Sequence, residues 1–141
     1  MNEPLFDLLV WIWILTGIII FPLLLKVKAP YGRHSKGTWG PVLNSKAGWI
    51  IMEMPSLIIF ACFFIFGKGQ HSLTNWIFFS LWILHYGNRT LIFPFRLRTR
   101  EKKMPLVIVL MGIFFNLINA SLNGYYLGSI APAYEDTWML D

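Results

Sequence analysis

Four long apolar runs divide the chain of 141 residues, and each is long enough to cross a lipid bilayer as a helix. They cover residues 4–25, 48–66, 73–95 and 105–127. A membrane-spanning helix needs about 20 predominantly apolar residues. The runs do not alternate apolar and polar residues, as the strands of a membrane barrel do. The pattern therefore predicts an all-α integral membrane protein in which residues 1–141 form a single domain with four spans.

Basic residues concentrate in two of the connections between these runs. Ten of the twelve lysines and arginines lie in residues 26–47 and 96–103, whereas acidic residues gather near the two ends of the chain. Lysine and arginine favour the cytoplasmic side of a membrane. We therefore expect both basic connections in the cytoplasm and both termini on the opposite side. The membrane would be the endoplasmic reticulum or a bacterial inner membrane.

The composition agrees with a membrane protein. Hydrophobic residues make up 56% of the chain and charged residues only 13%, whereas a soluble domain carries about 25% charged residues. The net charge of +5 does not indicate a nucleic-acid partner, because the aromatic residues that would stack on bases lie within the apolar runs. The single cysteine, Cys62, cannot form a disulfide within the chain.

Ionisable side chains inside a span are costly and mark candidate functional sites. Glu53 lies in the second run and Arg89 in the third, each about six residues from the cytoplasmic end, or roughly 9 Å deep at 1.5 Å per residue. Tyr86 shares a helix face with Arg89, because residues three apart are neighbours. These side chains predict a polar cavity that opens towards the cytoplasm.

Further polar residues surround this candidate cavity. Asn116, Asn119 and Asn123 form one face of the fourth run, at spacings of three and four. Hydrogen bonds between helices are an alternative explanation for these asparagines. His85 is adjacent to Tyr86, but we expect no metal site, since no second strong ligand lies at a suitable spacing.

The Glu53 and Tyr86 pair suggests chemistry on a carbonyl group. A buried carboxylic acid can stay protonated and donate a hydrogen bond, as a tyrosine hydroxyl does. Two donors aimed at one carbonyl oxygen would favour reduction of a conjugated enone. This role requires Arg89 to point away from Glu53, so that orientation is expected. The alternative is an ion pair between Glu53 and Arg89 that only connects two spans.

Short motifs run in order over nearly the whole chain. They are APYGRHS at 29–35, GW at 48–49 with EMPS at 53–56, HYGNRT at 85–90 with IFPF at 92–95, MPL at 104–106, and NGYYL at 123–127. In this order the motifs resemble the steroid 5α-reductase (3-oxo-5α-steroid 4-dehydrogenase) family. No glycine-rich dinucleotide fingerprint of a Rossmann domain is present in the sequence.

The resemblance implies a membrane enzyme that takes hydride from NADPH and saturates the 4,5 double bond of a 3-oxo-4-ene steroid or a similar lipophilic enone. It implies that Glu53 and Tyr86 are catalytic and hold the carbonyl. Met52, where the family usually has glutamine, and Asn119 would also contact the substrate. The residues implied in NADPH binding are Arg98, Arg100, Arg89 and Tyr31.

The chain is shorter than the family it resembles. Family members have nearly twice this length and a bundle of about seven membrane-spanning helices. We therefore expect this chain to be the N-terminal portion, inactive without a C-terminal half that carries much of the cofactor site. Two alternatives remain: a reductase of trans-2-enoyl-CoA, and a non-catalytic membrane subunit whose polar residues only connect helices.

Overall fold

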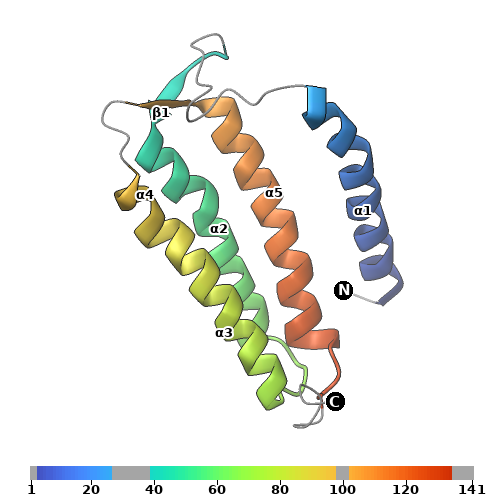
Figure 1. The fold of residues 1–141 in the computed structure, drawn as a ribbon. Coiled ribbons are helices and arrows are strands. Elements are labelled where there is room, and N and C mark those ends of the chain that lie inside the picture. Colours follow the sequence, from blue (N-terminus) through green and yellow to red (C-terminus); the bar gives the residue numbers. More distant parts are fainter. Residues whose placement is uncertain (1–2, 27–38, 98–101, 135–141) are drawn as a thin grey trace.

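Long helices arranged side by side make up most of the described chain (Figure 1). The computed structural model describes residues 3–26, 39–97 and 102–134. Its elements are α1 (Glu3–Lys26), β1 (Val42–Asn44), α2 (Ser45–Ile65), α3 (Leu73–Gly87), η2 (Asn88–Ile92), α4 (Phe93–Arg96), β2 (Lys103–Pro105), α5 (Leu106–Tyr125) and η3 (Tyr126–Ile130).

Three helical segments within the described residues are long and apolar enough to cross a membrane. They are Glu3–Lys26, Ser45–Ile65 and Leu106–Ile130. These segments coincide with three of the four apolar runs, and they confirm the all-α membrane class. The fourth predicted span, residues 73–95, is not among the three and stays a prediction.

That remaining run is helical, but it is divided among α3, η2 and α4. The backbone widens to a π-helix over Asn88–Ile92, where the Phe93 N–H donates to the carbonyl of Asn88. Pro94 follows at once, and a proline has no N–H to continue an α-helical ladder. A π-turn is a common device at functional sites in helices. This one carries Arg89.

Helix α2 lies between α3 and α5 and packs most extensively against α5 (Figure 1). Small residues on α5 allow this close approach, as is usual between membrane helices. A Cβ atom at Gly112 would meet the Met52 side chain at 3.0 Å, and one at Gly124 would meet the Phe60 backbone at 3.0 Å. A Cβ atom at Gly128, in the η3 segment that follows α5, would overlap the carbonyl of Phe63.

A short antiparallel sheet joins the beginnings of α2 and α5. Val42 pairs with Pro105 and Asn44 with Lys103. These strands were not expected from the pattern of apolar runs. Their pairing brings the starts of α2 and α5 together at one end of the helices, while the first and last described residues lie at the opposite end (Figure 1).

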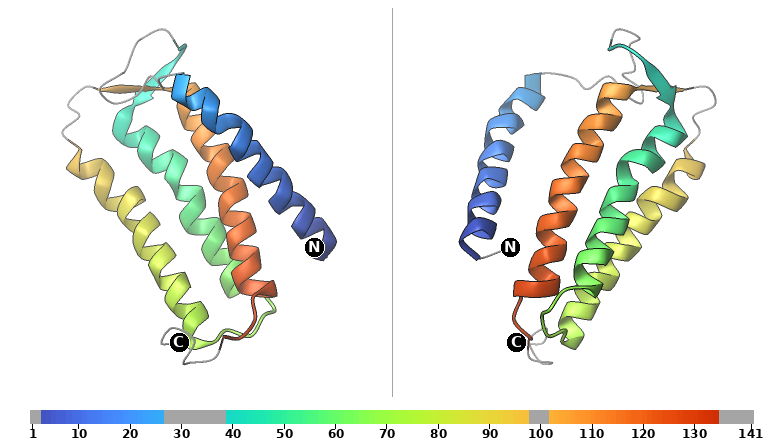
Figure 2. Two further views of the ribbon diagram at one scale, coloured as in Figure 1. Left: turned by 45° about the vertical axis from the view of Figure 1, so that its right-hand side comes forward. Right: turned by 180° about the vertical axis from the view of Figure 1, so that it is seen from behind.

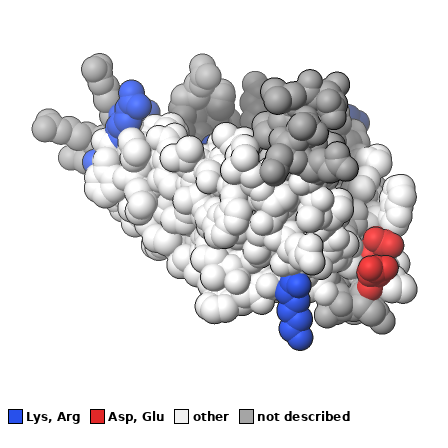
Figure 3. Space-filling model, turned by 90° about the horizontal axis from the view of Figure 1, so that it is seen from below, with Lys and Arg blue, Asp and Glu red and all other residues white. Residues whose placement is uncertain are grey.

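Helix α1 lies along α5, on the side away from α3 (Figure 2). Its aromatic contacts with α5 include Trp13 with Phe115 at 5.5 Å and Phe6 with Tyr125 at 5.9 Å between ring centroids. Most of its apolar side chains are exposed, and Leu25 is 73% exposed. A lipid environment would cover such exposed apolar side chains along the helix. Figure 3, seen from below, shows a mostly uncharged surface at this end, with acidic residues at one edge and a few basic residues elsewhere.

The arrangement of the connections gives a topology prediction. Single cysteines replacing the exposed Gln70 and Lys102, in a Cys62→Ser background, should react with a membrane-impermeant maleimide from opposite sides of the membrane. Position 102 should label from the cytoplasmic side, because basic connections favour it. Labelling of both positions from one side would contradict the predicted topology.

Candidate functional site

An ion pair within the helices is the centre of the candidate site. The Glu53 side chain comes from α2 and is 5% exposed, and that of Arg89 comes from η2 and is 37% exposed. Nε and Nη2 of Arg89 both donate to Oε1 of Glu53, at 3.0 and 2.5 Å. The expectation that Arg89 points away from Glu53 is therefore wrong. A buried carboxylate without a partner is costly, and Arg89 supplies the opposite charge from the neighbouring helix.

The guanidinium of Arg89 also lies over an aromatic ring. Its Cζ atom is 5.1 Å from the ring centroid of Trp49, which is within cation–π range. Trp49 lies near the start of the second apolar run, in the GW motif at 48–49. The structure places Trp49 beside the ion pair of Glu53 and Arg89.

A single cavity of about 300 Å³ contains three of the four predicted catalytic and substrate-binding residues. Its lining includes Met52, Glu53, Tyr86 and Arg89, from α2, α3 and η2. Asn116 also lines this cavity, whereas the predicted substrate residue Asn119 is not among its lining residues. A cavity with Glu53, Tyr86 and Arg89 in its lining is therefore present in the described part of the chain, but Asn119 and Asn123 are not among its lining residues.

The asparagines of α5 have different surroundings. Nδ2 of the buried Asn116 donates to the backbone carbonyl of Met52 at 2.5 Å and so joins α5 to α2 beside Glu53. Nδ2 of Asn123 instead donates to the carbonyl of Asn119 at 2.8 Å, within α5. The interhelical hydrogen bond considered for these residues is confirmed for Asn116.

Tyr86 lies between two other rings of α3. The ring centroid of Trp82 is 4.7 Å away, and that of His85 is 5.0 Å away. Trp82 was not among the predicted site residues. Its only signal in the sequence is the spacing of four residues from Tyr86, which places both side chains on one helix face.

Most of the predicted cofactor residues lie outside the described part of the chain. Tyr31, Arg98 and Arg100 belong to residues 27–38 and 98–101, so the structure does not place them. Arg89 is the fourth, and its Nε and Nη2 groups bind Glu53. Among the described residues there is thus no assembled site for the phosphates of NADPH.

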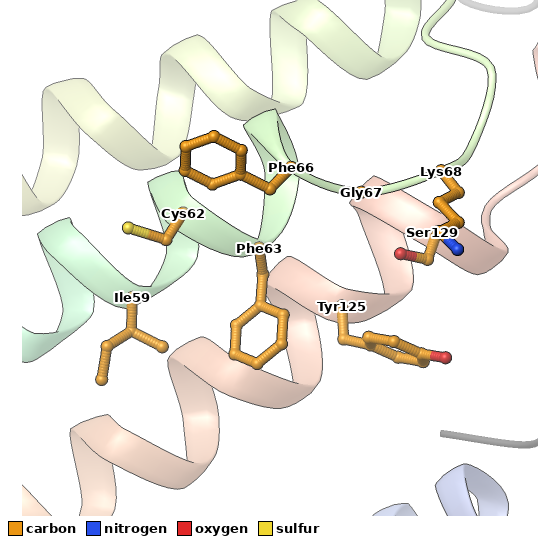
Figure 4. A pocket seen from close by; sticks show the side chains of 8 residues that line it. All are labelled: Ile59, Cys62, Phe63, Phe66, Gly67, Lys68, Tyr125 and Ser129. Atoms are coloured by element: carbon orange, nitrogen blue, oxygen red, sulfur yellow. The ribbon is translucent and has the colours of Figure 1, made fainter.

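Two larger hollows lie nearer the opposite end of the helices. One, of about 570 Å³, shares His85 and Tyr86 with the polar cavity and is otherwise mostly aromatic and apolar. On its wall, a hydrogen bond with Tyr126 raises the pKa of Tyr134 above its usual value. The other hollow, of about 790 Å³, is lined from α2, α5 and their ends, with Lys68 as its charged residue (Figure 4). It has no pair of polar groups comparable to Glu53 and Tyr86.

These features define a helical membrane protein with a charged, polar cavity between its helices. No family model matches the chain. It is 33% identical over 115 residues to steroid 5-alpha-reductase DET2 of Gossypium hirsutum, covering 78% of this chain and 44% of that protein. It is 33% identical over 142 residues to 3-oxo-5-alpha-steroid 4-dehydrogenase 1 of Bos taurus, covering 97% of this chain and 54% of that protein.

The protein named 3-oxo-5-alpha-steroid 4-dehydrogenase 1 of Homo sapiens is 30% identical over 142 residues, covering 99% of this chain and 54% of its own length. The chain thus spans about half the length of the curated relatives it matches. The resemblance predicted from the motifs is confirmed, because these relatives are steroid 5α-reductases and 3-oxo-5α-steroid 4-dehydrogenases.

Proposed function

We propose that this chain is the substrate-binding part of an NADPH-dependent membrane reductase that saturates the 4,5 double bond of 3-oxo-4-ene steroids. The observation that carries the proposal is the cavity that Glu53 and Tyr86 share, in a chain similar to named steroid 5α-reductases. The surrounding apolar helices suit a lipophilic substrate that enters from the bilayer.

Tyr86 acts as a hydrogen-bond donor to the carbonyl oxygen of the enone. NADPH, when bound, supplies the hydride that adds to the β carbon of the double bond. Electron density then moves onto the carbonyl oxygen, and a proton completes the reaction at the α carbon. A donor placed at that oxygen stabilises the transition state more than the ground state, because negative charge develops there.

Glu53 supplies the second hydrogen bond to the same oxygen when it is protonated. The ion pair with Arg89 competes with this role, because a carboxylate paired with a guanidinium group only accepts hydrogen bonds. Arg89 occupies Oε1, whereas Oε2 has no hydrogen-bond partner among the described residues. A protonated Glu53 would accept from Arg89 at Oε1 and donate from Oε2 to the substrate. In this arrangement Arg89 orients the carboxyl group. Met52, buried in the same cavity, packs against the apolar skeleton and offers no further polar contact.

The remaining parts of the enzyme lie beyond this cavity. Arg98, Arg100 and Tyr31 would contribute to binding of the phosphates, for which the planar guanidinium group is well suited. A C-terminal half, present in the longer relatives, would supply the other cofactor contacts. The basic connections would face the cytoplasm, in the endoplasmic reticulum or a bacterial inner membrane.

A non-catalytic membrane subunit is the second candidate, and the ion pair between Glu53 and Arg89 favours it. Paired charges that connect two helices need no substrate to explain them. Asn116 likewise joins α5 to α2 through a hydrogen bond. This candidate predicts that the full protein reduces no enone.

An activity measurement separates these functions. Membranes containing the full-length protein should consume NADPH in the presence of a 3-oxo-4-ene steroid and form the product with a saturated 4,5 bond. Membranes without the protein are the control. Reduction of trans-2-enoyl-CoA but not of the steroid would favour the alternative reductase. If neither compound causes consumption of NADPH, the result would support the non-catalytic subunit.

A further inference from the structure

Trp82 connects the helix that carries Tyr86 to the helix that carries Glu53. Its indole Nε1–H donates to the backbone carbonyl of Ser56 at 3.0 Å. Ser56 follows Glu53 by three residues on α2, which is one helical turn. The Trp82 ring also stacks on Phe60 of α2, with 4.3 Å between centroids and 11° between planes. Trp82 is thus fixed to α2 both by a hydrogen bond and by ring stacking.

Tyr86 lies between two such connections. Trp82 precedes it by four residues and contacts its ring, with centroids 4.7 Å apart. Arg89 follows it by three residues and binds Glu53. Spacings of four and three place all three side chains on one face of the helical segment. The Tyr86 ring is therefore held between two attachments to α2, one through Trp82 and one through Arg89.

The other ring contacts between α3 and α2 lie nearer the opposite end of the helices, where Trp76 and Phe79 pack on Phe64. The packing between α2 and α3 is far less extensive than that between α2 and α5. A small shift of α3 would change the separation of Tyr86 from Glu53. Catalytic hydrogen bonds tolerate little displacement, and a misplacement of about 1 Å can reduce a rate about a hundredfold.

We propose that Trp82 is a positioning residue, which fixes the Tyr86 ring at the separation from Glu53 that a shared carbonyl oxygen requires. The inference rests on the proposed reductase function. The indole N–H is essential to it, since this group makes the hydrogen bond to Ser56 and a phenyl ring would only stack. If Trp82 merely filled space, a ring of the same size without a donor would replace it fully.

The test removes the N–H donor at position 82, and one of the two replacements also keeps the size of the tryptophan ring. In the full-length protein, Trp82→Phe and benzothienylalanine at position 82, which has the size of tryptophan but no N–H, should lower kcat for the steroid about tenfold. KM should change less, because the cavity lining at Glu53 and Met52 is unaltered. In a Tyr86→Phe background the same replacements should have no further effect, since Trp82 acts through the Tyr86 hydroxyl.

Trp76→Phe is the matched control. Trp76 belongs to the same helix and packs on Phe64 and Phe79, at 5.0 and 5.5 Å between centroids. It makes no ring contact with Tyr86 among the described residues. The control variant should keep the kcat of the unaltered protein. Equal losses in Trp76→Phe and Trp82→Phe would show a general loss of packing and overturn the proposal.

A readout independent of turnover is fluorine NMR of 3-fluorotyrosine at position 86. Loss of the Trp82 donor should shift and broaden this resonance, and Trp76→Phe should not. If the protein reduces no enone yet the resonance responds, the proposed function fails while the attachment of Tyr86 stands. An unchanged resonance, or losses of kcat that add in the double variant, would overturn the role of Trp82.

Discussion

Tyr86→Phe should lower the kcat of the full-length reductase about a hundredfold or more, because removal of one donor to a developing oxyanion costs about 10²–10³ in kcat. The substitution removes only the hydroxyl group. The phenyl ring can keep its contacts with Trp82 and His85, so the fold should be retained. The measurement is steady-state reduction of a 3-oxo-4-ene steroid, together with the affinity for NADPH, which should not change.

Tyr125→Phe provides the control for this prediction. Tyr125 is also in the helical bundle, but it packs against Phe63 and Phe6 and lines a different hollow (Figure 4). Its replacement should leave kcat within about twofold, since a donor remote from the oxyanion does not stabilise it. Full turnover in Tyr86→Phe would remove the tyrosine from the mechanism.

Glu53→Gln and Glu53→Ala should differ strongly in activity. Glutamine reproduces the hydrogen bonding of a protonated glutamate, because its oxygen accepts from Arg89 and its NH₂ group donates to the substrate. We expect Glu53→Gln to keep kcat within about tenfold. Glu53→Ala should lose about a hundredfold or more, because the donor is absent and Arg89 loses its partner.

The two substitutions should also differ in stability. Loss of one partner from a buried ion pair costs about 3–5 kcal/mol, and this cost should be smaller here because 37% of the Arg89 side chain is exposed. Thermal unfolding in detergent measures this effect. If Glu53→Gln is as inactive as Glu53→Ala, the site needs an ionised carboxylate as the partner of Arg89. The donor role of Glu53 would then be wrong.

The spans could be predicted from the sequence because length and apolarity are properties of a continuous segment. The division of residues 73–95 could not, since the π-turn at Asn88–Ile92 depends on how the backbone meets its neighbours. The strands β1 and β2 have three residues each and pair across distant parts of the chain. Such short strands carry no recognisable alternation.

The cavity was predictable in part. Position along a span gives the depth of a residue, and this correctly placed Glu53 and Arg89 at similar levels. Depth does not give the direction in which a side chain points across the bundle. The pairing of Arg89 with Glu53 was missed for this reason. Trp82 was missed because its bond to Ser56 joins two helices whose relative rotation the sequence does not specify.

The close packing of α5 against α2 bears on how a substrate would reach the cavity. Gly124 of α5 and Gly128 of the following η3 segment leave no space for even a methyl group against α2, so the two helices cannot slide or separate without losing that fit. Helices α2 and α5 thus form the rigid side of the bundle. Helix α3 packs less extensively against α2 and is the part able to move. An entrance from the bilayer would therefore open beside α3, and its width would limit which molecules enter.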